Sequence, residues 1–173
     1  MKNKMFLFVA IAIISTVIGV YFALHRLEPQ PPQQSASKLF FAQTLPDAKG
    51  VSQALSKWQG KILVVNFWAT WCPPCVEEMP ELAALQKEMA SRNIQIVGIS
   101  IDSASNVSEF SKKHNIDYPL YIAGMNGTEL SKQFGNQIGA LPFTVVIGVD
   151  GQIKKTYLGR LKFAELRQDL LSQ

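Results

Sequence analysis

Two runs of apolar residues stand out along the chain, at residues 62–68 and 94–101. Each is almost uninterrupted by polar residues, which is typical of a strand buried on both faces of a sheet. Between the runs, apolar side chains recur at spacings of three, three and four residues, which predicts a helix with one buried face. These positions are Met79, Leu82, Leu85 and Met89. The pattern therefore predicts a β-α-β unit with two parallel strands, and a helix kinked at Pro80, which has no backbone N–H.

The remainder of the chain alternates between short helical and extended patterns. Asn106 and Glu109 form a capping-box variant, which predicts a helix ending near residues 114–115. A strand at 118–123 and a helix at 128–134 should follow, and then a hairpin whose strands, 144–149 and 152–158, are joined by a two-residue primed turn at Asp150-Gly151. An apolar stripe predicts a final helix. Its members are Phe163, Leu166 and Leu170. Together these segments predict an α/β fold, with a central mixed sheet flanked by helices.

The first 24 residues have a different pattern, because residues 5–24 contain no charged side chain. Twenty residues of helix reach about 30 Å, the thickness of the apolar core of a membrane. The segment lacks a convincing small-x-small cleavage site, so we expect an uncleaved signal anchor at residues 1–24 rather than a removed signal peptide. Lys2 and Lys4 precede the span, which predicts a cytoplasmic N-terminus and an extracytoplasmic remainder. For a bacterial chain this is a single-pass protein of the cytoplasmic membrane with its folded domain in the periplasm.

Residues 25–37 are rich in proline, glutamine and serine. This composition favours an extended, polyproline-like chain, so we expect a linker that lifts the folded part off the membrane. Residues 38–173 then form one domain, because their number suits one compact core but not two.

The formal net charge of +4 does not indicate a nucleic-acid-binding protein. Two of the 17 basic side chains, Lys2 and Lys4, precede the apolar segment, and the other 15 nearly balance the 13 acidic ones. The basic residues are scattered instead of gathered in a stripe, which gives nucleic acid binding little support.

The only two cysteines, Cys72 and Cys75, are separated by two prolines and follow the first apolar run directly. A strand that delivers a C-x-x-C pair to the start of a helix is the arrangement that thiol–disulfide exchange requires. The helix N-terminus has unpaired N–H groups and a partial positive charge, and both favour a thiolate. The pair is therefore interpreted as a redox centre. An extracytoplasmic location agrees with this interpretation, because disulfides persist there.

Two structural roles for the cysteines are alternatives to a redox centre. A zinc site needs about four ligands, and the only histidines, His25 and His114, do not have ligand spacing to the pair. A stabilising disulfide is also a weak interpretation, because a bridge across so short a loop removes little chain entropy. We therefore expect no metal site, and no haem, nucleotide or flavin motif indicates another cofactor.

At this point the sequence resembles the thioredoxin superfamily, and in particular the membrane-anchored bacterial thiol–disulfide oxidoreductases of the TlpA/ResA type. The resemblance covers residues 38–173 and is carried by four short segments. They are Gly60-Lys61, the run from Val65 to Cys75, the run from Glu77 to Pro80, and Leu141-Pro142. It implies a thioredoxin fold with two additions, one at the N-terminus and one inserted within about 101–134. It also implies that Pro142 is cis and lies against the disulfide, so that the backbone of Leu141 can pair with an extended substrate peptide.

Roles follow for the residues near the cysteines. Cys72 is the expected nucleophile and Cys75 the shielded resolving thiol, acting through a mixed disulfide with the client. Since Pro73 and Pro74 have no N–H, we expect only a modest lowering of the Cys72 pKa and a reducing centre. Trp71 is expected beside the sulfur atoms, limiting water, with an ordinary core tryptophan as the alternative.

The resemblance implies that Glu78 lies near the cysteines and assists proton transfer at the resolving thiol. Without the resemblance, Glu78 would be a solvated helix residue, as Glu77 is expected to be. Ordinary thioredoxins have a buried aspartate where this chain has Asn66. Asn66 cannot take a proton, so the role of base passes to Glu78 or to water.

The expected function is that of an extracytoplasmic reductase of protein disulfides, supplied with electrons by a membrane thiol donor. Apocytochrome c and a copper-site protein are candidate clients by family analogy, although Phe143 stands where the cytochrome-maturation branch often has a polar residue. Two alternatives stay open. One is a thiol peroxidase, which usually has Thr three residues before its reactive cysteine, where this chain has Ala69. The other is a non-catalytic module that binds a soft metal such as copper through both thiols.

Overall fold

The structure, a computed structural model, describes residues 14–16, 18–19 and 32–173. The expected membrane span at residues 5–24 falls largely outside these residues. Within the described parts of the chain, no helix is long and apolar enough to cross a membrane. The compact unit comprises Pro32–Gln173 and begins earlier than the expected boundary at Lys38.

A five-stranded sheet in the order β5-β4-β3-β6-β7 forms the centre of this unit. The central strand β3 (Ile62–Trp68) pairs in parallel with β4 (Ile94–Ser100), which pairs in parallel with β5 (Leu120–Ile122). On its other side β3 pairs antiparallel with β6 (Phe143–Ile147), followed by β7 (Ile153–Leu158). The predicted β-α-β unit and the mixed sheet are therefore confirmed.

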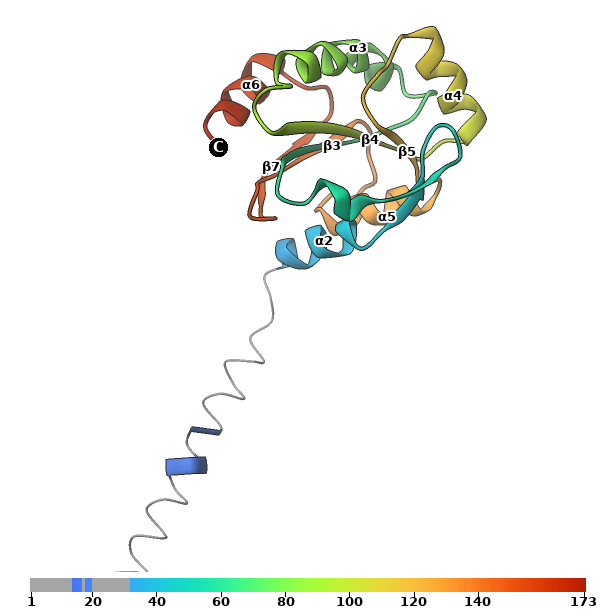
Figure 1. Cartoon of the computed structure of the whole chain (residues 1–173). Coiled ribbons are helices and arrows are strands. Elements are labelled where there is room, and N and C mark those ends of the chain that lie inside the picture. Colours follow the sequence, from blue (N-terminus) through green and yellow to red (C-terminus); the bar gives the residue numbers. More distant parts are fainter. Residues whose placement is uncertain (1–13, 17, 20–31) are drawn as a thin grey trace, which may run out of the picture. The chain divides into compact units, whose positions relative to one another are not determined.

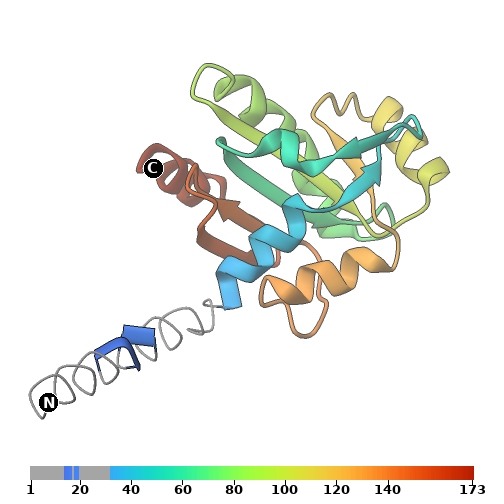
Figure 2. The same cartoon turned by 60° about the horizontal axis from the view of Figure 1, so that its bottom comes forward.

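Helices cover both faces of the sheet (Figure 1). One face carries α3 (Pro73–Glu88), α4 (Ala104–Lys113) and α6 (Phe163–Leu171). The other carries α2 (Pro32–Phe41) and α5 (Asn126–Gln133), which lie side by side in Figure 2. Successive residues of β3 point to opposite faces, so Val64 and Trp68 belong to one apolar cluster while Val65 and Phe67 belong to the other.

The last part of the predicted linker is helical, which corrects the expectation of an extended chain up to residue 37. Helix α2 begins at Pro32, and its side chains Ala36 and Phe40 are buried one turn apart. The ring of Phe40 packs against Phe134 at the end of α5, with a centroid distance of 5.9 Å. Burial of this apolar face outweighs the polar composition of the segment.

The N-terminal addition also contains a two-stranded sheet, formed by β1 (Thr44–Pro46) and β2 (Ser52–Ala54), and a short 3-10 helix, η1 (Leu55–Trp58). The region of the expected central insertion, 101–134, holds α4, β5 and α5.

Two local predictions are wrong in detail. The N-cap of α4 is Ser103, whose side chain accepts the N–H of Asn106, so the helix begins before Asn106. The β6–β7 connection, residues 148–152, is closed by the N–H of Gly148 donating to the carbonyl of Gln152 at 2.8 Å, so residues 149–151 form the loop inside this bond. Gly151 alone in this loop has a positive φ, of 74°. This is the arrangement of a type I turn followed by a glycine bulge and not of a primed turn.

Helix α3 continues through Pro80, and the expected kink there stays a prediction.

Candidate active site

Cys72 and Cys75 form a disulfide at the start of α3, with their Cα atoms 5.3 Å apart. Cys72 is the N-cap residue of this helix and directly follows the loop that leaves β3. Both cysteines are buried, Cys75 completely and Cys72 with 4% of its surface exposed. Pro73 and Pro74 occupy the first two helical positions, so the amide of Cys75 is the first N–H of the helix that faces a Cys72 thiolate.

The Leu141–Pro142 peptide bond is cis, as the resemblance implied. Phe143 pairs with Phe67 in the sheet, so Pro142 lies beside the end of β3, at the edge from which the active-site loop starts. The strand register therefore brings Pro142 and Cys72 to the same end of the molecule, although they are far apart in the sequence. Pairing of a client with the backbone of Leu141 remains a prediction.

Glu78 is completely buried, which excludes the solvated alternative for this residue. It lies one turn along α3 from Cys75. Its Oε1 accepts the amide N–H of Asn66 at 2.8 Å, and its Oε2 accepts the backbone N–H of Leu161 at 3.0 Å. Burial raises the pKa of Glu78 to about 7, although the hydrogen bonds from Leu161 and Asn66 oppose the change. A carboxyl group with this pKa exchanges its proton near neutral pH.

Asn66 donates to Glu78 and also bonds to a residue of β6, which fixes the position of both side chains. Its Nδ2 also donates to Oγ1 of Thr144 at 3.0 Å. Asn66 was expected near the site, because it stands where ordinary thioredoxins have a buried aspartate, but Thr144 and the Leu161 amide were not predicted. Both are contributed by the C-terminal half of the fold, and no local pattern marks them. Glu77, in contrast, is exposed as expected and pairs with Arg160 at 2.8 Å.

Trp71 is 64% exposed, so the alternative of a core tryptophan is wrong for this residue. Its expected role of limiting water at the sulfur atoms stays a prediction. The core position belongs to Trp68, which is completely buried. Trp71, the residue before Cys72, instead presents an exposed aromatic surface.

A second carboxylate, Asp102, fixes the loop before Cys72. Its Oδ2 accepts both the backbone N–H of Thr70, at 3.3 Å, and the Thr70 hydroxyl. Its Oδ1 accepts from the N–H of Ser103 at 2.6 Å and from Nδ2 of Asn106 at 2.8 Å. The active-site loop is therefore tied to the first turn of α4. No local pattern in the sequence marks this contact.

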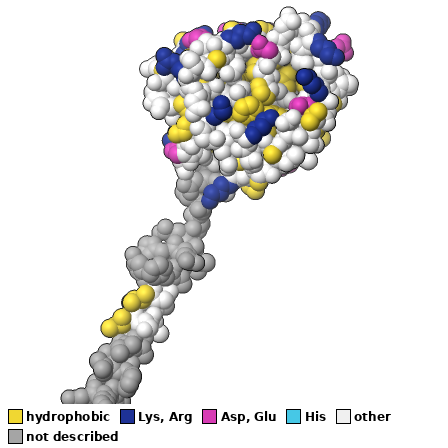
Figure 3. All heavy atoms as spheres, in the orientation of Figure 1, with side chains coloured by type: hydrophobic (Ala, Val, Ile, Leu, Met, Phe, Trp, Pro, Cys, Tyr) yellow, Lys and Arg dark blue, Asp and Glu magenta, His cyan; other side chains and the backbone are white. Residues whose placement is uncertain are grey.

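Charged side chains elsewhere are mixed in sign. Figure 3 shows lysine and arginine side chains spread over this face of the domain, with acidic ones among them. Most of the acidic side chains in the described residues form surface ion pairs, for example Glu88 with Arg167 at 2.9 Å. The scattered distribution expected from the sequence is found on this face.

The fold and the disulfide at the start of α3 together define a class, the thioredoxin-like thiol–disulfide oxidoreductases. Residues 34–170 match the Redoxin family, and the chain belongs to this family. It is similar to the thiol-disulfide oxidoreductase ResA of Geobacillus thermodenitrificans, with 29% identity over 74% of this chain and 72% of the relative. It is also similar to ResA of Bacillus subtilis, with 28% identity over 93% of this chain and 89% of that protein.

Solved structures agree on the fold. A thioredoxin-family thiol:disulfide interchange protein of Chlorobium tepidum superposes with a TM-score of 0.65 at 28% identity, over 76% of this chain and 95% of its own. A secreted disulfide oxidoreductase of Mycobacterium tuberculosis gives a TM-score of 0.66 at 21% identity, over 78% of this chain and 98% of its own. The chain is thus a ResA-type thiol–disulfide oxidoreductase with a redox-active disulfide.

Proposed function

We propose that the chain is an extracytoplasmic reductase of protein disulfides, tethered to the membrane by its N-terminal segment. In its reduced form, the Cys72 thiolate attacks a client disulfide, forms a mixed disulfide and releases one client thiolate. Cys75 then attacks the Cys72 sulfur and releases the second client thiolate. The client gains two electrons, and the chain is left with the Cys72–Cys75 disulfide.

Glu78 takes the proton of Cys75 in the second step. A thiol has an ordinary pKa of about 8.5, so at neutral pH it must lose its proton to become a nucleophile. Support for this role comes from the burial of Glu78, its pKa of about 7 and its place one turn from Cys75. Asn66, Thr144 and the Leu161 amide act as positioning groups for the carboxylate. A membrane thiol donor then returns two electrons to the chain.

The observation that carries the direction of transfer is the proline pair at the start of α3. Neither Pro73 nor Pro74 offers an N–H to a Cys72 thiolate, so the dithiol form gains little stabilisation from the helix terminus. A less stabilised dithiol means a lower reduction potential and a reducing centre. Candidate clients are an apocytochrome c or a copper-site protein, by analogy with relatives.

The equilibrium reduction potential against glutathione tests this proposal. We expect the chain to equilibrate near thioredoxin, at roughly −270 mV. A value near that of the oxidant DsbA, roughly −120 mV, would make the chain a disulfide donor and overturn the proposal.

A further inference from the structure

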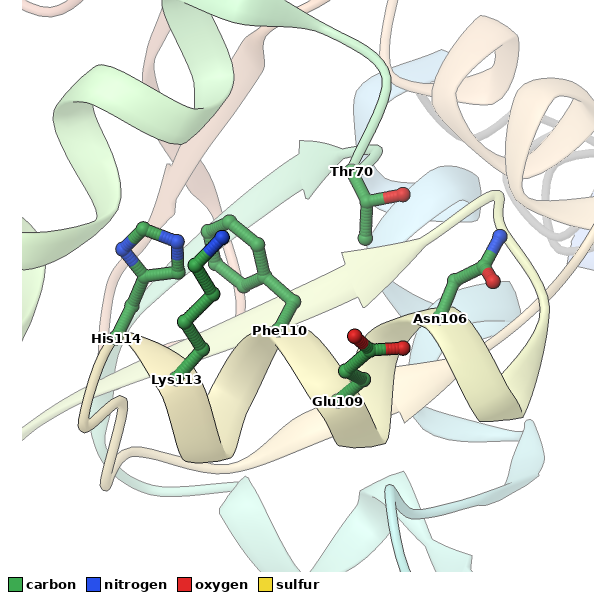
Figure 4. A pocket seen from close by; sticks show the side chains of 6 residues that line it. All are labelled: Thr70, Asn106, Glu109, Phe110, Lys113 and His114. Atoms are coloured by element: carbon green, nitrogen blue, oxygen red, sulfur yellow. The ribbon is translucent and has the colours of Figure 1, made fainter.

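A recess of about 200 Å³ lies between the active-site loop and α4. Its walls are Thr70 from the loop and, from α4 and its C-cap, Asn106, Glu109, Phe110, Lys113 and His114 (Figure 4). Sites for small organic ligands usually measure about 300–1,000 Å³, so this recess suits one or two side chains of a polypeptide. Thr70 precedes Cys72 by two residues, so one wall of the recess belongs to the same loop as the nucleophilic cysteine.

The two walls are held together before a client arrives. Asp102 accepts hydrogen bonds from Thr70 on one wall and from Asn106, at 2.8 Å, on the other. The floor is fixed as well, because the rings of Phe110 and His114 stack at a centroid distance of 4.3 Å and Phe110 packs on Trp68 at 5.1 Å. A preformed recess loses little conformational entropy when it binds a side chain.

Charge distinguishes the two ends of the recess. Burial raises the pKa of Asp102, but hydrogen bonds from Thr70, Ser103 and Asn106 outweigh it, so the pKa is lowered and the group is ionised. All these donors are neutral. Glu109 forms no ion pair with any described residue, and Figure 4 shows its carboxylate on the side of Thr70 and Asn106.

Lys113 points the other way, toward Phe110 and His114 (Figure 4). The end of the recess next to the active-site loop is therefore lined by the Glu109 carboxylate, which forms no ion pair with a described residue. The ionised Asp102 does not line the recess, but it adds a second negative charge behind Thr70 and Asn106. This end is complementary to a positively charged side chain, while Lys113 repels such a side chain from the far end.

We propose that this recess binds a lysine or arginine side chain of the client polypeptide, located two or three residues from the client cysteine that Cys72 attacks. The inference rests on the proposed reductase function. Thr70 and Cys72 lie in one turn, in which the Cys72 N–H donates to the Ala69 carbonyl at 3.2 Å. The Thr70 wall is therefore within the roughly 7 Å that two residues of extended client chain reach. The methylene stem of the client side chain packs against Phe110, and its charged group reaches Glu109.

Reduction of synthetic peptides tests the proposal. Three peptide disulfides carry Lys, Ala or Glu two residues from the cysteine, and the reduced full-length chain is mixed with each. We expect the Lys peptide to react about 2–5-fold faster than the Ala peptide and the Glu peptide to react more slowly, with the differences shrinking at high salt. Glu109→Lys should abolish or reverse this order, and Lys113→Glu should enlarge the advantage of the Lys peptide.

The matched control is Glu129→Lys, which makes the same charge change on α5, on the opposite face of the sheet. It should keep the wild-type order. Equal rates for the three peptides, or equal behaviour of Glu109→Lys and Glu129→Lys, would overturn the recess proposal alone. Failure to reduce any peptide would overturn the reductase function, and the recess proposal with it.

Discussion

Burial of Glu78 disfavours the charged form of its carboxyl group, so the free energy of unfolding depends on pH. Its pKa is about 7 in the folded chain against an ordinary value of 4.5. The folded chain therefore binds this proton more tightly than the unfolded chain, and the stabilisation is complete below about pH 4.5 and lost as the pH rises through about 7. The shift corresponds to about 3 kcal/mol.

We expect the free energy of unfolding of the oxidised chain to fall between pH 5 and pH 8, and Glu78→Gln to remove most of this slope. Denaturant titrations at the two pH values measure it. Glu77→Gln is the matched control, because the carboxylate of Glu77 is next to Glu78 in the sequence but is exposed and pairs with Arg160. Equal slopes in the wild type and Glu78→Gln would mean that Glu78 is not the titrating group.

Tyr118 gives a second prediction, because its hydroxyl is buried without a hydrogen-bond partner among the described residues. Burial and the charges of Glu78 and Asp117 raise its pKa well above the ordinary value, so the hydroxyl stays protonated. Tyr118→Phe removes an unsatisfied polar group, and we expect the stability to be unchanged or to rise by about 1 kcal/mol.

Tyr121→Phe is the contrasting variant, because the hydroxyl of Tyr121 accepts the indole N–H of Trp58 at 2.9 Å. It should lower the stability by about 1 kcal/mol. If thermal unfolding shows the two variants equally destabilised, then the Tyr118 hydroxyl has a partner, such as an internal water.

At the scale of elements, the sequence predicted best those strands that are buried on both faces. The bounds of β3 agree with the apolar run at 62–68, because every position from Leu63 to Trp68 is buried and therefore apolar or internally bonded. The strands β1 and β2 were not predicted. Each has three residues and is partly exposed, so their pairing leaves no hydrophobic pattern.

Helix α2 shows why the domain boundary was predicted too late. Its polar composition resembles a linker, but Ala36 and Phe40 meet the sheet once the helix forms. A fragment that starts at Lys38 loses Ala36 and leaves Phe40 in a frayed end, so we expect it to be less stable than a fragment that starts at Pro32. The difference should be about 1–3 kcal/mol. Equal urea midpoints for the two fragments would show that the first turns of α2 contribute nothing.

At the scale of the whole molecule, the candidate site consists of a local motif and distant supports. The cysteines could be found from the sequence because their chemistry depends on two residues in one turn. Asn66 and Glu78 were also identified, but their partners could not be, because Asn66 bonds to Thr144 across 78 positions and Glu78 bonds to the Leu161 amide across 83. Only the strand order, with β6 beside β3, brings these groups together.

The same architecture determines which cysteine a client can reach. The edge of the sheet where β3 ends also holds the cis Leu141–Pro142 bond and the exposed Trp71. Cys72 opens onto this edge with 4% of its surface exposed, whereas Cys75 is covered completely. We therefore expect Cys75→Ser to accumulate a mixed disulfide with a client or model peptide through Cys72, since no resolving thiol remains. Cys72→Ser should accumulate much less, because Cys75 cannot be approached. Mass spectrometry without reductant measures both adducts, and a larger yield for Cys72→Ser would reverse the assignment of nucleophile and resolving thiol.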